Sequence, residues 1–171
     1  HMQGAGIDEG KNHLSLQIAK RLLSNFIAFE QRYLDESIKK GYHLNILQSE
    51  GLFERDLHIN GVNFTIKGKV DRIDEFAKEL RIIDYKSGKV DKIDVSFKHW
   101  DDLKDSPSKS KSLQLLIYAY LYLKNHPHYL DKKVIAGNFS FKNLREDLIT
   151  TAKYVNNKKE TLYINQYVMD K

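Results

Sequence analysis

The dipeptide Asn60-Gly61 constrains the fold of this chain most, because it separates two segments that have the residue pattern of β-strands. Asn-Gly favours the two-residue turn of a β-hairpin, and residues 62–70 alternate apolar and polar side chains with the period of a strand. We therefore predict a first strand around residues 47–54 and a second strand that ends at Asp71. Gly68 lies inside the second strand, where we expect a bulge or a close approach of another segment.

Two further strands are predicted downstream of this hairpin. Residues 80–86 begin with an apolar run and stop at Ser87-Gly88, and the short links on either side predict an antiparallel three-strand meander. Residues 133–141 form a fourth predicted strand. Residues 160–168 have period-two features, so we expect a final strand or hairpin there.

Two helices complete the predicted fold. In residues 12–40, apolar side chains recur at steps of three and four, which places them on one helix face; they are Ile18, Leu22, Phe26, Phe29 and Tyr33. Residues 113–123 are apolar on nearly all sides, so we expect this helix to be buried on most faces. The order of helix, meander, helix and strand predicts an α/β fold with a central mixed sheet flanked by helices, and not a doubly wound parallel sheet.

The composition limits the class of protein. A length of 171 residues fits one domain, which we expect over residues 3–171 as part of a longer protein, with His1-Met2 as an expression scar. The chain has no cysteine, which excludes disulfides, thiolate zinc sites and an iron–sulfur cluster within it and fits a cytoplasmic location. No apolar run approaches the roughly 20 residues of a membrane span, so we expect no membrane association. A net charge of +5 is compatible with a nucleic-acid partner without requiring one.

Asp84 and Lys86 are the first candidates for chemistry. Side chains alternate along a strand, so these two should point to the same face at the end of the third strand. Asp71, at the predicted end of the second strand, could converge on them if the strands bend. Two carboxylates and a backbone carbonyl would form an oxygen site of the kind that Mg²⁺ or Mn²⁺ prefers. The alternative is a structural ion pair of Asp84 and Lys86, which would contribute little to stability.

Three other polar residues could belong to the same site. Gln114 and Tyr118 lie four residues apart on one face of the predicted buried helix, which could deliver both to the two acids. The alternative for Gln114 is a core glutamine with satisfied hydrogen bonds. Glu50, in the first strand, could be a third acid of the site or a strand residue that faces solvent.

Three segments of the sequence together resemble the RecB-like branch of the PD-(D/E)XK nucleases. That branch carries the motifs G-x-x-D-R-I-D, D-Y-K-[ST]-G and Q-x-x-x-Y in this order. The matching segments are Gly68-Lys69-Val70-Asp71-Arg72-Ile73-Asp74, Asp84-Tyr85-Lys86-Ser87-Gly88 and Gln114-Leu115-Leu116-Ile117-Tyr118. The resemblance covers residues 46–142.

The resemblance implies a restriction-endonuclease-like core and Mg²⁺-dependent cleavage of DNA phosphodiester bonds. It implies Asp71 and Asp84 as metal ligands together with the backbone carbonyl of Tyr85, and Lys86 as the catalytic lysine. Gln114 and Tyr118 would support the site or contact the DNA backbone, and Glu50 would match an acid found in some members. Such domains occur in helicase–nuclease subunits of the RecBCD and AddAB type and as exonucleases that stand alone.

The resemblance also implies a histidine ligand on an N-terminal helix, for which His13 is the candidate in this chain. Its surroundings do not match the usual Gly-x-x-x-His helix start, so we expect the family's histidine to lie upstream of this sequence. The resulting hypothesis is a metal-dependent DNA nuclease, acting as an exonuclease with a helicase subunit or helicase region as partner. The alternative is a DNA-binding or scaffolding domain of the same fold without activity.

Overall fold

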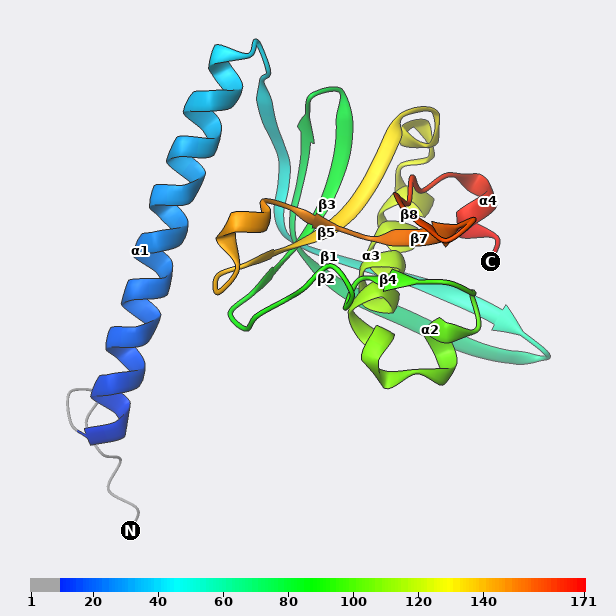
Figure 1. The fold of residues 1–171 in the computed structure, drawn as a ribbon. Helices are drawn as coiled ribbons and strands as arrows, with labels where there is room; N and C mark the ends of the chain where they lie inside the picture. Colours follow the sequence, from blue (N-terminus) through cyan, green and yellow to red (C-terminus); the bar gives the residue numbers. More distant parts are fainter. Residues whose placement is uncertain (1–9) are drawn as a thin grey trace.

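The computed structural model describes residues 10–171, so the predicted expression scar at residues 1–2 lies outside the described residues. A five-stranded mixed sheet in the order β1-β2-β3-β5-β6 forms the centre of the molecule (Figure 1). Its strands are β1 (Leu44–Ile59), β2 (Val62–Phe76), β3 (Glu79–Lys86), β5 (Lys133–Ser140) and β6 (Ile149–Thr150). All neighbours pair antiparallel except β3 and β5, which are parallel. The predicted α/β fold with a mixed sheet is therefore confirmed.

The hairpin at Asn60-Gly61 forms as predicted, although its strands are longer than the sequence pattern indicated. Ile59 pairs with Val62 across the turn, and Asn60 and Gly61 have φ angles of 50° and 81°. Two successive positive φ angles are what the tight hairpin turn of this hand requires. The second strand continues to Phe76 instead of ending at Asp71, so Asp71 lies within β2.

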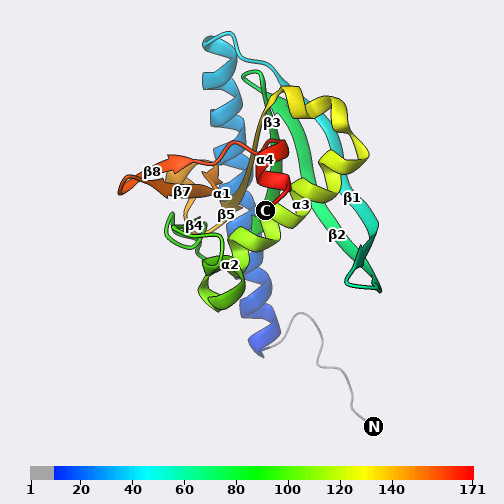
Figure 2. The ribbon, with the colours of Figure 1, turned by 90° about the vertical axis from the view of Figure 1, so that its right-hand side faces the viewer.

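Helices cover the sheet on both faces. Helix α3 (Ser110–Asn125) lies in the crossover between the parallel strands β3 and β5 and packs on one face, and α1 (Gly10–Lys39) lies along the other (Figure 2). On the α3 side, Leu80 and Ile82 of β3 are fully buried with Leu115 and Ala119 of the helix. Burial on both faces explains why β3 reads as an almost continuous apolar run.

Helix α1 packs on the sheet only along its C-terminal half. Phe26 and Phe29 are buried against Ile83 of β3 and Phe139 of β5. Ile18, which we predicted on the same helix face, is 50% exposed, because the N-terminal half of the helix extends past the sheet (Figure 1). The predicted limits of the helix agree with the structure within two residues, but only the C-terminal part of the predicted apolar face is buried.

A smaller sheet and several short elements complete the fold. The small sheet has the order β4-β7-β8, with β4 (Ser96–Phe97), β7 (Ala152–Val155) and β8 (Lys158–Thr161). The short helices are α2 (Asp102–Asp105) and α4 (Gln166–Met169), and 3-10 turns span Pro107–Lys109, Pro127–Asp131 and Leu144–Glu146. The predicted strand or hairpin at residues 160–168 is wrong beyond Thr161, because the Asn165 side chain accepts a hydrogen bond from the Val168 N–H and caps α4. No described helix is long and apolar enough to cross a membrane.

A buried ionic network ties α1 to the sheet. Asp74 is fully buried and accepts hydrogen bonds from Arg72 at 2.6 Å and from Arg81 at 2.6 and 3.0 Å. Arg72 also pairs with Glu30 of α1, and Arg81 donates to the Tyr33 hydroxyl of the same helix at 2.9 Å. Charges removed from water are tolerated when they are paired and hydrogen-bonded in this way.

The expected close approach occurs at Gly68. A Cβ atom at this position would lie 3.0 Å from side-chain carbons of Leu121 and Tyr118 of α3. We expect Gly68→Ala to lower the free energy of unfolding by about 1–3 kcal/mol, because the added methyl group would push α3 away from β2. Urea denaturation measures this loss. Gly88→Ala is the control, since a Cβ there would meet nothing within 4 Å; an equal loss in both variants would contradict the packing explanation.

Candidate active site

Asp84 and Lys86 point to the α3 side of the sheet at the C-terminal end of β3. They follow Leu80 and Ile82 in the alternation of the strand, and these two side chains are buried against α3. The Lys86 Nζ lies 2.9 Å from Oδ2 of Asp84. The Asp84 side chain is only 6% exposed and that of Lys86 is 27% exposed, so the pair is shielded from water but open on the lysine side.

The Asp71 side chain lies near Asp84 and Lys86, because the side chains of β2 switch from one face of the sheet to the other at this point. Val70 packs toward α3, whereas Arg72 turns toward Glu30 of α1. The antiparallel pairing of β2 with β3 ends at Arg72 and Ile83, so Asp71 and Asp84 are the next residue on each strand, and the charge of Asp71 acts on Asp84. The Asp71 Oδ2 accepts a hydrogen bond of 2.7 Å from the Tyr85 N–H. Two carboxylates from adjacent strands therefore lie together.

The opposite strand is also irregular at this point. Glu50 has a φ of 55°, and no pair forms between it and Asp71, although Ser49 pairs with Arg72 and Gly51 with Val70. Such local departures from the ladder bend a strand and are frequent beside active sites. The register of the β1–β2 pair shifts between Ile46 and Gln48, so the bulge that was one of the two expectations for Gly68 lies elsewhere in the hairpin.

Helix α3 contributes two polar side chains to Lys86. The Lys86 ammonium donates to Gln114 Oε1 at 2.9 Å, and Gln114 Nε2 donates to the Tyr118 hydroxyl at 2.7 Å. The two α3 residues are one turn apart and share a face, as their spacing predicted. Gln114 thus connects the helix to the lysine, and both of its polar groups are satisfied.

Burial controls the ionisation of Asp84. Desolvation raises the pKa of this carboxyl, and the negative charge of Asp71 raises it further. The Lys86 ammonium and the Asn138 amide lower the same pKa by hydrogen bonding. A carboxylate under such opposing influences has the environment expected at a functional site.

The carboxylates keep oxygens that a metal ion could use. The Asp84 carboxylate binds Lys86 and Asn138 through Oδ2, and the Asp71 carboxylate binds the Tyr85 N–H through Oδ2. Within residues 10–171, the Oδ1 atom of each carboxylate forms no hydrogen bond. Free carboxylate oxygens on adjacent strands fit a hard divalent cation, with the Tyr85 carbonyl as the third predicted donor. Among the described residues, no group of three or more His, Cys, Asp or Glu side chains is arranged to hold a metal.

Two predicted residues lie apart from these contacts. Glu50 is exposed and forms an ion pair with Lys69 across the hairpin. His13 is exposed on the N-terminal half of α1, the half that extends past the sheet (Figure 1). Within the described part of the chain, neither forms a hydrogen bond or ion pair with Asp71, Asp84 or Lys86.

Asn138 and Ser140 of β5 were missed by the sequence reasoning. Asn138 Nδ2 donates to the side chain of Asp84 at 2.8 Å and to its backbone oxygen at 3.2 Å. Ser140 donates to the Gly88 carbonyl at 2.8 Å and accepts from the Val90 N–H at 3.1 Å, which holds the segment after Lys86. The only available signal was polar residues in an otherwise apolar strand, and this signal does not identify their partners.

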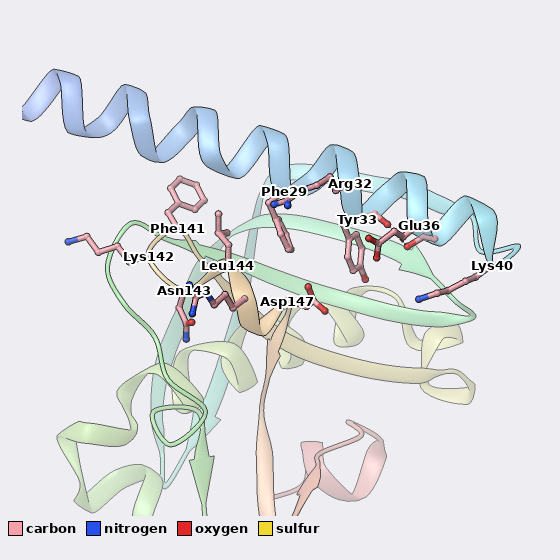
Figure 3. A pocket seen from close by; sticks show the side chains of 12 residues that line it. Phe29, Arg32, Tyr33, Glu36, Lys40, Phe141, Lys142, Asn143, Leu144 and Asp147 are labelled. Atoms are coloured by element: carbon pink, nitrogen blue, oxygen red, sulfur yellow. Dashed lines mark hydrogen bonds between the residues drawn. The ribbon is translucent and has the colours of Figure 1, made fainter.

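A cavity lies on the other face of the sheet. It has a volume of about 800 Å³ and is lined by side chains of α1 and of the connection between β5 and β6, including Tyr33, Lys40 and Asp147 (Figure 3). The Asp84–Lys86 pair points to the α3 side instead. This cavity is therefore separate from the candidate active site.

The mixed α/β fold agrees with the class of protein that a comparison with known families identifies. The family model of the PD-(D/E)XK nuclease superfamily matches residues 5–168. The chain therefore belongs to this superfamily, as its sequence motifs predicted, and its class is that of a nuclease.

Individual relatives cover the chain only in part. Over 99 residues, 33% are identical to a subunit of the ATP-dependent helicase/deoxyribonuclease of Carboxydothermus hydrogenoformans. That match covers 56% of this chain and 8% of the relative, so the chain spans a small part of the relative's length. Among solved structures, the crystal structure of SSO0001 aligns with 92% of this chain and 59% of its own, with 15% identity and a TM-score of 0.34.

Proposed function

We propose that the chain is a Mg²⁺-dependent deoxyribonuclease domain that acts as an exonuclease within a helicase–nuclease of recombination and repair. The observation that carries this proposal is the contact of Lys86 with both Asp84 and Gln114, beside Asp71. This arrangement places one cation and two carboxylates on one side of a strand end. The helicase context is supported by the name of the relative, which is a subunit of a helicase/deoxyribonuclease.

The residues have separate roles in the proposed reaction. Asp71 and Asp84 would hold Mg²⁺ or Mn²⁺ together with the Tyr85 carbonyl. A divalent ion bound there supplies polarisation of the phosphoryl oxygen and a lower pKa of bound water. Lys86, held by Gln114, would stabilise the charge that develops on the phosphate of the DNA or orient the attacking water. Gln114 and Tyr118 keep this ammonium in one position, which lowers the cost of organising the site.

Metal binding tests the proposal directly. We expect calorimetric titration to show Mn²⁺ and Mg²⁺ binding to the wild-type protein. We expect Asp71→Asn to weaken metal binding by more than about 100-fold. Loss of a group that only hydrogen-bonds a metal ligand weakens binding by roughly 10- to 100-fold, and this substitution removes a ligand itself. Asp56→Asn on the exposed hairpin is the matched control. Wild-type protein that binds DNA without binding either metal would favour the scaffolding alternative.

A further inference from the structure

We infer that Asn138 is a positioning residue that holds the Asp84 carboxylate in the orientation needed for metal binding. This inference rests on the proposed function, because it concerns the same site. Asn138 is fully buried in β5, and β5 lies beside β3 with Asp84 and Asn138 as register partners. The parallel pairing of the two strands therefore places the amide next to the carboxylate.

The hydrogen bonds of Asn138 converge on Asp84. Its Nδ2 donates to Asp84 Oδ2 at 2.8 Å and to the Asp84 backbone oxygen at 3.2 Å. Lys86 binds the same Oδ2 from the open side of the site. The carboxylate is thus held through one oxygen by two donors, and Oδ1 stays free of hydrogen bonds within the described residues.

The side-chain oxygen of Asn138 indicates that this residue does more than fill space in the core. Asn138 Oδ1 is buried and has no hydrogen-bond partner within residues 10–171. An unpaired buried polar atom lowers stability, so a leucine, which has the same number of side-chain heavy atoms, would avoid that cost. What leucine lacks is the N–H group that donates to Asp84.

Without Asn138, the carboxylate would depend on Lys86 alone. The lysine ammonium would then have to orient Asp84 as well as face the phosphate, although its side chain is partly exposed. Groups that hydrogen-bond a metal ligand fix its orientation, and their loss weakens metal binding. Asn138 therefore leaves Lys86 available for the substrate.

The test uses two substitutions and one matched control. Asn138→Leu removes the donor and the unpaired oxygen together, and Asn138→Ser replaces the amide with a shorter side chain whose hydroxyl can still donate a hydrogen bond. Thr151→Val is the control, because Thr151 Oγ1 is the other buried atom without a partner in the described part of the chain. Calorimetric titration with MnCl₂ gives the Kd, and thermal unfolding without metal gives the Tm.

We expect Asn138→Leu to raise the Kd for Mn²⁺ by about 10- to 100-fold, with a Tm within about 4 °C of the wild type. The Kd of Asn138→Ser should lie between those of the wild type and Asn138→Leu, and Thr151→Val should leave the Kd unchanged. An unchanged Kd in either folded Asn138 variant would overturn the inference. If neither variant folded, the inference would also be overturned, because Asn138 would then serve only the packing of the core. A wild type that does not bind Mn²⁺ would overturn the proposed function and this inference with it.

Discussion

Replacing Lys86 with alanine is expected to lower the rate of Mg²⁺-dependent degradation of linear DNA by about 10²- to 10³-fold. The Lys86 ammonium is the cation that contacts Asp84 in the site, and Gln114 holds it from α3. A fixed positive charge in a partly desolvated site stabilises developing negative charge far more than a mobile charge in water does. Release of acid-soluble nucleotides from linear duplex DNA measures the rate.

Lys89→Ala is the matched control for this prediction. Lys89 lies three residues further along the chain, and its exposed side chain pairs with Asp91. We expect this variant to degrade linear DNA at the wild-type rate. Lys86→Ala should keep the wild-type Tm within a few degrees, because its side chain is partly exposed. Equal rates for both variants and the wild type would refute the role of Lys86. Degradation of covalently closed circular DNA as fast as linear DNA would refute exonuclease action.

The largest expected loss of stability comes from Asp74→Ala. Asp74 is the shared acceptor of Arg72 and Arg81, and all three side chains are at most 7% exposed. Removing the carboxylate would leave two guanidinium groups buried without their main partner. Breaking a buried ion pair in this way costs about 3–5 kcal/mol of unfolding free energy. For a chain of this size, each kcal/mol lowers the Tm by about 2–4 °C, which calorimetry measures.

An exposed ion pair gives the comparison for Asp74. Glu54 and Lys67 face each other on the hairpin, with side chains that are 61% and 62% exposed. We expect Glu54→Ala to leave the Tm unchanged, because solvent screens such pairs. If Asp74→Ala lowered the Tm no more than Glu54→Ala, the buried network would not be what holds α1 against the sheet.

These two predictions concern sequence motifs whose residues have separate functions. Asp71 faces the candidate active site, whereas Arg72 and Asp74 turn to the opposite face and bind each other, and Arg72 also binds Glu30 of α1. Tyr85 shows the same division, because its N–H binds Asp71 and its hydroxyl accepts from Arg72 at 3.1 Å. The sequence pattern alone does not separate the residues that we propose for chemistry from those that support the fold.

The sequence by itself determined the features that depend on neighbouring residues. The turn at Asn60-Gly61 follows from the φ angles that these residues tolerate, and the common face of Asp84 and Lys86 follows from strand alternation. The extent of α1 follows from apolar residues at helical spacing. The three motifs in order predicted the nuclease superfamily that the family model confirms.

Only the tertiary structure decided which of these residues meet. The pairing of β2 with β3 brings Asp71 to the N–H of Tyr85, beside Asp84, and the crossover of α3 brings Gln114 to Lys86. Asn138, 54 residues after Asp84 in the chain, reaches it through parallel pairing of β3 and β5. Glu50 instead pairs with Lys69. Such contacts depend on how separate elements pack. The spacing of residues along the chain does not determine the distance between two strands or between a helix and a sheet.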